Sequence, residues 1–285
     1  MLKSSLKYVI PILLIGSVIL VYTETKDTTH LSKFRSTAQP YPKKLTEQGL
    51  EKGLAELRIS GSGRISQSPL KKALADVKVP IYVLDLQQEL HYFINGLLVN
   101  WFGYDLKTDK YFVEMGPLKP KPLLRRLLAT GKFFPTMNDT QTEKQVIEGL
   151  GYHYIGGAQL RGRVPQPQEV DNFIQLINSL PKPSWVHFHC SGGNSRTTMA
   201  MIIVDILNNG RELSLEDIVK RHVYLGAPDL FDTTVWTNGT YTKEQLLARK
   251  NFIIQFYDYM NDPKGFGILS WQDWVKENDL KKEAA

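Results

Sequence analysis

The chain has 285 residues, of which 42% are hydrophobic and 22% are charged, and its formal net charge is +6. This composition is typical of a globular protein with one main domain. The single cysteine, Cys190, excludes an internal disulfide framework and a zinc site with several cysteine ligands. The positive charge favours an anionic partner, but no run of Lys and Arg is dense enough to indicate nucleic acid.

The first 26 residues predict a signal peptide or a membrane anchor that is not part of the fold. Lys3 and Lys7 precede an apolar run over residues 8–22, which ends abruptly at polar residues. This run is shorter than the ~20 residues that span a bilayer, and no small-x-small cleavage site is evident, so both alternatives stay open. The lysines place residues from about 27 onward outside the cytoplasm. We therefore expect an exported protein: periplasmic, secreted, or anchored to the membrane through residues 8–22.

A polar lead-in segment over residues 27–75 is expected to wrap a domain over residues 76–285. Within it, the sequence Ser60-Gly61-Ser62-Gly63 predicts a flexible turn between short helices. The core is expected to begin at Pro80, because residues 81–84 form a continuous apolar run, typical of a strand buried on both faces.

Strands and helices alternate through the rest of the chain. Further strands are expected over residues 93–102, 152–155 and 185–188, and helices over residues 123–128, 142–150, 170–180, 199–207, 214–222 and 243–260. The run at 199–207 is apolar all round, as in a buried helix. This alternation predicts an α/β fold, with a central mixed or parallel sheet flanked by helices.

The segment that carries the chemistry lies between the predicted strand at 185–188 and the helix at 199–207. It reads His189-Cys190-Ser191-Gly192-Gly193-Asn194-Ser195-Arg196-Thr197. A strand-to-helix loop with two glycines can point successive backbone N–H groups inward, and the helix N-terminus adds its positive end. Ser191, Gly192, Gly193, Asn194 and Ser195 are therefore predicted to form a phosphate-binding loop.

Four side chains of this segment are predicted to be catalytic. Cys190 is the expected nucleophile, because the field of the loop and the neighbouring cations lower the pKa of a thiol. Arg196 can hold two phosphoryl oxygens with its planar guanidinium. Thr197 is expected to hydrogen-bond the sulfur, and His189 to order the loop from behind.

The segment resembles the protein-tyrosine-phosphatase (PTP) signature, Cys-x5-Arg with a preceding histidine and a following threonine. Its surroundings are similar to one branch, the bacterial PTP-like inositol phosphatases or cysteine phytases, over residues 33–262. The similar segments are Lys33-Phe34-Arg35, residues 60–66, 81–89, 93–96 and 185–190. The resemblance implies a PTP-like α/β domain, a cysteinyl-phosphate intermediate, no metal or cofactor, and inositol polyphosphates as the leading substrates. Phosphotyrosine or phosphoinositides follow, so the expected partner is a phosphorylated small molecule or phosphoprotein.

Three features depart from the pattern of that family: the loop that carries the acid, Gln87 and Ser195. The aspartate that protonates the leaving group falls at Arg161, the histidine after it falls at Gly162, and residues 156–168 contain no acid. An arginine of the family is replaced by Gln87, and the last glycine of the loop by Ser195.

Three interpretations of these departures stay open. Another acid can substitute, with Glu169, Asp171, Asp229 and Asp232 as candidates. Alternatively, the enzyme works without a dedicated acid, at a loss of roughly 10²–10⁴-fold for poor leaving groups. In the third interpretation the chain is a phosphate-binding pseudophosphatase with little or no turnover.

Basic residues outside the loop are candidates for substrate binding. Lys33, Arg35, Arg161 and Arg163, together with Arg221, are predicted to contact the peripheral phosphates of a polyanion, although solvated loop charges explain them equally well. Two other reactions fit less well. Arsenate reduction needs further thiols, and sulfur transfer does not require the arginine.

Overall fold

The computed structural model describes residues 31–87, 140–157, 160, 164–235 and 241–283, and the backbones of four short strands between residues 92 and 111. The chain forms two compact units. The first comprises Met1–Leu31, Ser66–Ala75 and Glu89–Val146, and the second comprises Ser32–Ile65, Asp76–Gln88 and Ile147–Ala285. The predicted segment 1–26 and the predicted helix 123–128 lie outside the described residues. The division into residues 1–26, 27–75 and 76–285 stays a prediction.

Among the described residues, none of the helices has the length and apolar character that a membrane crossing requires.

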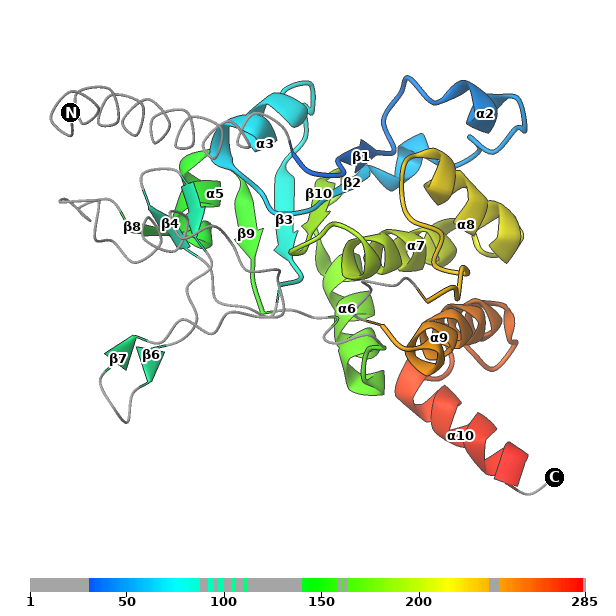
Figure 1. The fold of residues 1–285 in the computed structure, drawn as a ribbon. Helices are drawn as coiled ribbons and strands as arrows, with labels where there is room; N and C mark the ends of the chain where they lie inside the picture. The colour runs from blue at the N-terminus through cyan, green and yellow to red at the C-terminus, as the bar shows by residue number, and fades with distance from the viewer. Residues whose placement is uncertain are drawn as a thin grey trace, which may run out of the picture. The chain divides into compact units, whose positions relative to one another are not determined.

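A five-stranded sheet is the centre of the second unit (Figure 1). Its strands, in spatial order, are β1 (Arg35–Ser36), β2 (Ile59–Ser62), β10 (Trp185–His189), β3 (Ile81–Asp85) and β9 (His153–Ile155). β1 is antiparallel to β2, and the other neighbours are parallel. The predicted mixed sheet of an α/β fold is therefore confirmed.

The lead-in segment contributes to this sheet, which corrects two sequence-based expectations. The core does not begin at Pro80, and the predicted flexible turn at 60–63 is mostly strand β2, buried along its whole length beside β10. Small residues are needed there because helix α7 (Ser195–Asn209) packs against β2. A Cβ on Gly61 would lie 2.5 Å from Thr197 Cγ2 and 2.6 Å from Met201 Sδ. Such contacts are too short for any side chain.

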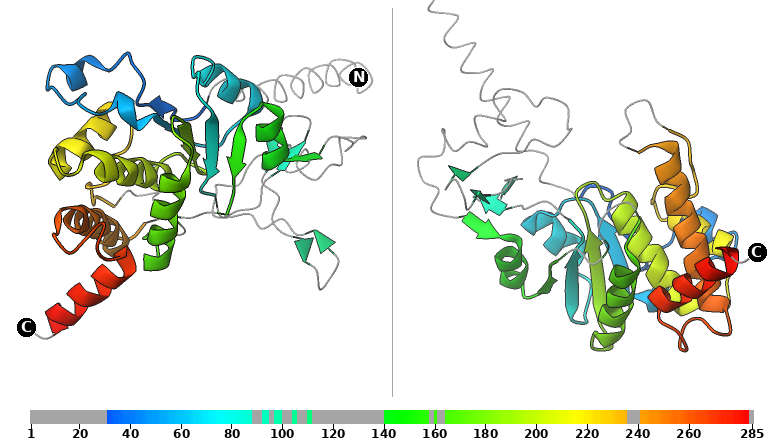
Figure 2. Two further views of the ribbon diagram at one scale, coloured as in Figure 1. Left: turned by 180° about the vertical axis from the view of Figure 1, so that it is seen from behind. Right: turned by 90° about the horizontal axis from the view of Figure 1, so that it is seen from below.

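The helices of the second unit are drawn in Figures 1 and 2, and together with the strands they supply its apolar core. They are α2 (Lys43–Thr46), the 3-10 helix η2 (Ala55–Leu57), α6 (Pro167–Ser179), α7 (Ser195–Asn209), α8 (Leu215–Tyr224), α9 (Lys243–Asn261) and α10 (Trp271–Glu283). The buried face of α6 places Phe173 against Phe188 of β10. α7 is buried from Thr197 to Ile206, as its apolar sequence predicts. Helix α10 was not predicted.

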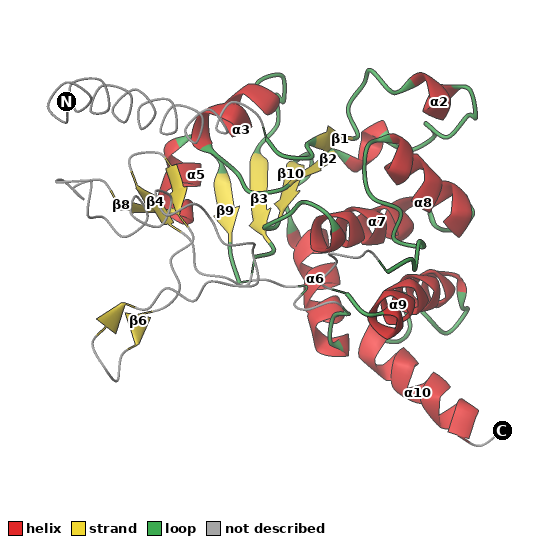
Figure 3. Ribbon diagram, in the orientation of Figure 1, coloured by secondary structure: helices red, strands yellow, loops and turns green. Residues whose placement is uncertain are grey.

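The first unit holds α3 (Gln67–Ala73) and two small sheets (Figure 3). β4 (Tyr92–Ile94) lies between β5 (Leu97–Val99) and β8 (Thr140–Thr142), and β6 (Tyr104–Asp105) pairs with β7 (Lys110–Tyr111). The single strand expected over 93–102 is thus the antiparallel pair β4–β5. The dipeptide Asn-Gly separates them in sequence, and it is the strongest short hairpin signal. Helix α5 (Glu143–Gly149) follows β8.

Candidate active site

The predicted phosphate loop joins the end of β10 to the start of α7 and packs against the lead-in segment. Gly193 has a φ of +68°, which favours glycine, and a Cβ there would lie 2.4 Å from the backbone nitrogen of Gly63. Ser191, Gly192, Asn194 and Arg196 keep some exposure, whereas Cys190 is only 3% exposed. The loop thus presents its rim to solvent and the sulfur lies at its base.

Hydrogen bonds and charge favour the thiolate of Cys190. The Thr197 hydroxyl donates to the sulfur over 3.1 Å, which is the contact that the sequence predicted. Burial alone would raise the pKa of Cys190. The hydrogen bonds from the side chain and backbone of Thr197, the charge of Arg196 and the N–H of Gly193 outweigh burial, so the pKa lies below its ordinary value.

Thr197 therefore allows a direct test of this arrangement. In Thr197→Val, the pH midpoint of iodoacetamide alkylation of Cys190 should move to higher pH, because the thiolate loses a donor. Regeneration of the thiolate should slow roughly tenfold, the effect of one hydrogen bond to a charged group. Thr197→Ser keeps the hydroxyl and should retain both properties. An unchanged alkylation profile in Thr197→Val would show that the hydroxyl does not act on the sulfur.

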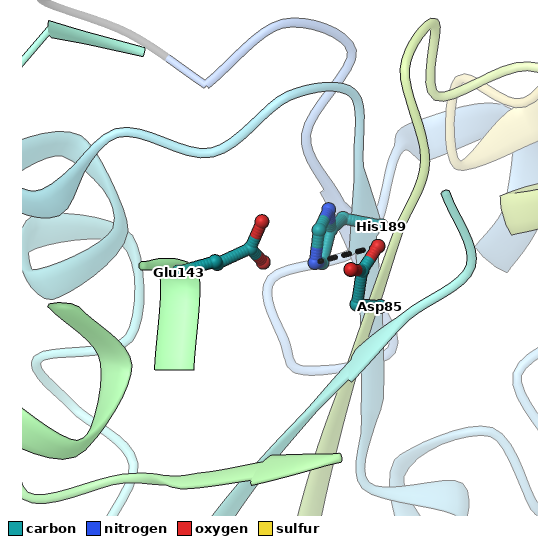
Figure 4. A group of neighbouring side chains, drawn as sticks. All are labelled: Asp85, Glu143 and His189. Atoms are coloured by element: carbon teal, nitrogen blue, oxygen red, sulfur yellow. Dashed lines mark ion pairs between the residues drawn. The ribbon is translucent and has the colours of Figure 1, made fainter. Parts of the chain in front are cut away.

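Arg196 and His189 lie beside the end of strand β3 and the residue that follows it. Arg196 Nη1 donates to the carbonyl oxygen of Leu86 over 2.6 Å. His189 is fully buried, and its Nε2 lies 3.8 Å from Oδ1 of Asp85 at the end of β3 (Figure 4). Asp85 also accepts hydrogen bonds from Gln87 N and from the hydroxyl of Tyr154. His189 has the position that an ordering role requires, directly before Cys190.

Arg35 does not lie where the sequence analysis placed it. We expected it to contact substrate, but it is 2% exposed and lies behind the loop. Its guanidinium donates to Gly193 O over 2.9 Å and to Thr198 Oγ1 over 2.8 Å. Burial lowers its pKa to about 10, while the charge of Cys190 opposes that shift. Arg35 therefore supports the loop from the inside of the fold.

Two other cations of the lead-in segment reach the rim of the loop. The exposed Lys33 donates from Nζ to Asn194 Oδ1. The partly buried Arg64 donates from Nε and Nη2 to Ser191 Oγ, over 3.2 and 3.0 Å. Lys33 was a predicted site residue, whereas Arg64 and Asp85 were not. The position of Asp85 at the carboxyl end of a buried strand, where sites gather in α/β sheets, was the available signal.

A series of buried hydrogen bonds joins β2 and β10 beneath the loop. The indole N–H of Trp185 donates to Ser60 Oγ over 2.8 Å, and Ser60 Oγ lies 2.9 Å from Nδ1 of His187. Ser62 Oγ lies 3.0 Å from Nε2 of His187 and donates to the carbonyl oxygen of Gly63. The Ser60 hydroxyl is therefore able to donate to Nδ1 of His187, and Ser62 Oγ is able to accept from Nε2–H. Both ring nitrogens of His187 are thus hydrogen-bonded in the neutral Nε2–H tautomer. This series of hydrogen bonds holds Gly63 in the position where its backbone contacts Gly193.

The four candidate substitute acids have structural roles. Glu169 completes a capping box at the start of α6, and Asp171 accepts hydrogen bonds from the first two backbone N–H groups of α10. Asp229 and Asp232 are exposed, and each accepts a hydrogen bond from the backbone two residues on. Arg161 and Arg163, predicted to bind substrate, and Gly162 lie outside the described residues.

The fold and the loop together define a class. A Cys-x5-Arg loop between a parallel strand and a buried helix of a mixed sheet is the arrangement of PTP-like domains, as the sequence resemblance implies. The comparisons with known proteins narrow this class to one branch.

The PTP-like phytase family, described as "Inositol hexakisphosphate", matches residues 126–208, which include the whole loop. The PTP-like myo-inositol phosphatase from Mitsuokella multacida, solved in complex with myo-inositol-(1,3,4,5)-tetrakisphosphate, aligns with a TM-score of 0.67 and 26% identity. The alignment covers 88% of this chain and 46% of that chain. A PTP-like phytase from Bdellovibrio bacteriovorus aligns with a TM-score of 0.60 and 29% identity, covering 88% of this chain and 92% of that one. The chain therefore matches the PTP-like phytase family over residues 126–208 and is similar in fold to bacterial PTP-like phytases over most of its length.

Two further bacterial proteins are similar to this chain in sequence. One is named an effector protein, and the other is named an uncharacterised protein. The effector protein HopD2 of Pseudomonas syringae pv. tomato is 28% identical over 245 residues, which cover 78% of this chain and 52% of HopD2. AvrBs1.1 of Xanthomonas campestris pv. campestris is 32% identical over 94 residues, which cover 33% of this chain and 89% of AvrBs1.1. The chain thus spans about half the length of HopD2 and of the Mitsuokella protein.

Proposed function

We propose that this protein is a cysteine-dependent phosphomonoester hydrolase that acts on inositol polyphosphates. The observation that carries the proposal is the Cys190 sulfur, which lies at the base of the loop with its pKa lowered by Thr197, Arg196 and Gly193. A phosphate-binding module has no need of a thiolate. The match of residues 126–208 to the PTP-like phytase family and the inositol phosphate bound to the Mitsuokella relative support the substrate class.

The reaction has two steps. The Cys190 thiolate attacks phosphorus, the bond from phosphorus to the ester oxygen breaks, and that oxygen leaves as an alcohol after taking a proton. Water then attacks the cysteinyl phosphate, the sulfur–phosphorus bond breaks, and inorganic phosphate leaves while the thiolate re-forms. Arg196 and the loop N–H groups hold the equatorial oxygens in both steps, and Thr197 donates to the departing sulfur.

The proton for the leaving alcohol comes from solvent in this proposal. Glu169, Asp171, Asp229 and Asp232 all accept backbone hydrogen bonds that organise helices or turns, which favours chemistry without a dedicated acid. A hydrolase without that acid turns over aryl phosphates, whose leaving groups need little protonation, faster than alkyl phosphates.

The experiment measures phosphate release by the full chain from inositol hexakisphosphate and from p-nitrophenyl phosphate. Release from both, with a higher kcat for the aryl ester, is expected, and acid-quenched samples should carry one phosphate on Cys190. Tight binding of inositol hexakisphosphate without release from either compound would instead identify the pseudophosphatase. A higher kcat for inositol hexakisphosphate would show that a general acid is present.

The site of action is proposed to be outside the cytoplasm of the producing cell. The lysines and apolar run of residues 1–26 support export or anchoring, and HopD2 is named an effector protein. Fractionation of cells that produce the full chain, with mass determination of its N-terminus, tests this assignment and distinguishes cleavage of the segment from its retention.

A further inference from the structure

Arg35 of β1 enters the fold on the face of the sheet that α7 covers. In the antiparallel pair of β1 and β2 it lies opposite Gly61, and residues directly opposite each other direct their side chains to the same face. A Cβ on Gly61 would lie 2.5 Å from Thr197 Cγ2, so this face is the one against which α7 packs. The side chain of Arg35 therefore extends toward the start of α7, where it is 2% exposed.

The guanidinium of Arg35 contacts both segments that supply hydrogen bonds to the sulfur of Cys190. Nη1 donates to Gly193 O over 2.9 Å, and the N–H of Gly193 is one of the donors to the sulfur. Nη2 donates over 2.8 Å to Oγ1 of Thr198, the neighbour of the second donor, Thr197. An anion-binding loop turns its N–H groups inward, so the carbonyl group of Gly193, which faces outward, needs a donor from the fold. Arg35 is that donor.

The charge of Arg35 has no carboxylate partner among the residues that the structure describes. Its hydrogen-bond acceptors are two carbonyl oxygens and one hydroxyl, all of them neutral. The buried carboxylate of Asp205 is paired with Arg221. Burial, together with the charges of Arg221 and Arg35, lowers the pKa of His222, so that residue is neutral as well. A buried cation without an opposite charge is costly, which indicates that another anion balances Arg35.

The anion that acts on Arg35 is the thiolate of Cys190. Burial lowers the pKa of Arg35 to about 10, and the charge of Cys190 opposes that shift. Arg35 thus keeps its positive charge over the pH range in which a thiol with a lowered pKa ionises. Opposite charges at a buried position favour each other's ionised form, so the effect is mutual.

Four other charged or titratable side chains belong to the elements around Cys190. They are Arg196, His189, Lys33 and Arg64. Arg196 keeps some exposure, and its guanidinium is the group suited to hold a phosphoryl group. Lys33 and Arg64 hydrogen-bond side chains at the rim, and His189 lies beside Asp85. Arg35 differs from these four in being a permanent cation that is buried and out of reach of substrate.

We propose that Arg35 is a positioning residue of the reaction, the permanent counter-charge of the Cys190 thiolate on the interior side of the phosphate loop. The inference rests on the proposed function, because it takes Cys190 as the nucleophile. Arg35 keeps the N–H of Gly193 directed at the sulfur and stabilises the anion before substrate arrives. When a phosphate ester binds, its negative charge opposes ionisation of the thiol and Arg196 turns to the phosphoryl oxygens. The charge of Arg35 then stays with the sulfur.

Iodoacetamide alkylation of Cys190 in the full chain tests the proposal without turnover. In Arg35→Met, the midpoint of the pH profile should move to higher pH, and alkylation below that midpoint should slow roughly tenfold, the effect of one neighbouring opposite charge. Arg35→Lys keeps the charge and should stay within about threefold of the unsubstituted rate, although it lacks the planar fork. Arg58→Met, which removes an exposed guanidinium directly before β2, is the matched control and should leave the profile unchanged.

A second measurement keeps the test decisive if Arg35→Met does not fold. In the unsubstituted chain, the side-chain ¹⁵N signals of Arg35 should shift at the pH midpoint of Cys190 alkylation, because ionisation of the thiol changes the charge beside the guanidinium. In Cys190→Ser, which has no thiolate, the same signals should show no such step. A step that persists in Cys190→Ser, or its absence from the unsubstituted chain, would contradict the pairing of Arg35 with the thiolate.

Two further results would overturn the proposal. An unchanged alkylation profile in folded Arg35→Met would leave Arg35 as a residue that only stabilises the fold. Equal shifts in Arg35→Lys and Arg35→Met would assign the effect to hydrogen-bond geometry and not to charge. Both readouts are independent of catalysis, so absence of phosphate release by the unsubstituted protein would contradict the hydrolase function, and the role of Arg35 would still be decided by ionisation of Cys190.

Discussion

Replacement of Cys190 by serine should lower the rate of phosphate release roughly 10⁴-fold or more, for aryl and inositol phosphates alike. The reason is the ionisation of the nucleophile. The donors around position 190 lower the pKa of a thiol enough to populate the thiolate, whereas a serine hydroxyl starts from a far higher pKa and stays protonated. Steady-state phosphate release by Cys190→Ser and the unsubstituted chain, measured side by side, checks the prediction.

Binding provides the control for that variant. Serine differs from cysteine by one atom, and the variant leaves the loop backbone and Arg196 unchanged, so inorganic phosphate should still bind. Loss of both binding and turnover would indicate a collapsed loop, and the comparison would then have to be repeated with Cys190→Ala. Turnover by Cys190→Ser within tenfold of the unsubstituted rate would contradict a covalent intermediate on Cys190.

The chemistry-bearing loop and its two flanking elements could be predicted from the sequence because each signal is local. β3 begins with four apolar residues, β10 contains Trp185, Val186 and Phe188, α7 has an apolar run from Met199 to Val204, and the glycines between β10 and α7 leave few alternatives to a tight loop. The contact between Thr197 and Cys190 follows from the same short segment, seven residues apart.

The role of the lead-in segment could not be predicted in the same way, because partners distant in sequence determine it. Ser and Gly in β2 have low strand propensity, and only the packing of α7 explains why small residues are needed there. Arg35 has the charge of a surface residue, and its burial depends on acceptors at Gly193 and Thr198. Likewise, Asp171 looks like an ordinary first-turn acid of α6 until α10 is placed beside it.

Arg221 is a further residue whose surroundings correct a sequence-based prediction. It was a candidate for contact with peripheral phosphates, but it is fully buried on α8, as are Asp205 of α7 and His222. The Arg221 guanidinium donates to both oxygens of Asp205, over 2.6 Å from Nε and through a shorter contact from Nη2. It also donates to Lys52 O, so the ion pair connects α7 and α8 to the lead-in segment.

The protonation states of this cluster follow from its burial. Burial opposes ionisation of Asp205, but the hydrogen bond from His222 and the hydrogen bonds and charge of Arg221 outweigh it and lower the pKa of the carboxyl group. Burial lowers the pKa of His222, despite the opposing effect of Asp205. His222 is therefore neutral and donates from Nε2 to Asp205 Oδ2 over 2.9 Å. The negative charge of Asp205 then balances the positive charge of Arg221. A protonated His222 would add a positive charge without a partner.

Asp205→Asn should accordingly reduce the free energy of unfolding by about 3–5 kcal/mol, the usual cost of leaving one buried charge without its partner. The variant keeps the volume of the side chain, so the loss arises from the uncompensated charge of Arg221. Urea denaturation followed by circular dichroism measures it. Lys52→Gln, which breaks the exposed pair between Lys52 and Glu212, should hardly move the urea midpoint.

The double variant Asp205→Leu/Arg221→Met separates charge from packing. Removal of both charges leaves no unpaired ion, and apolar side chains of similar size can replace a buried ion pair at little cost. The double variant should therefore be more stable than Asp205→Asn. A double variant that is no more stable than Asp205→Asn would mean that the hydrogen bonds from Arg221 to the lead-in segment, rather than charge balance, hold α8 in place. Because the same lead-in segment carries β2 and the residues that contact the phosphate loop, phosphate affinity would then fall together with stability.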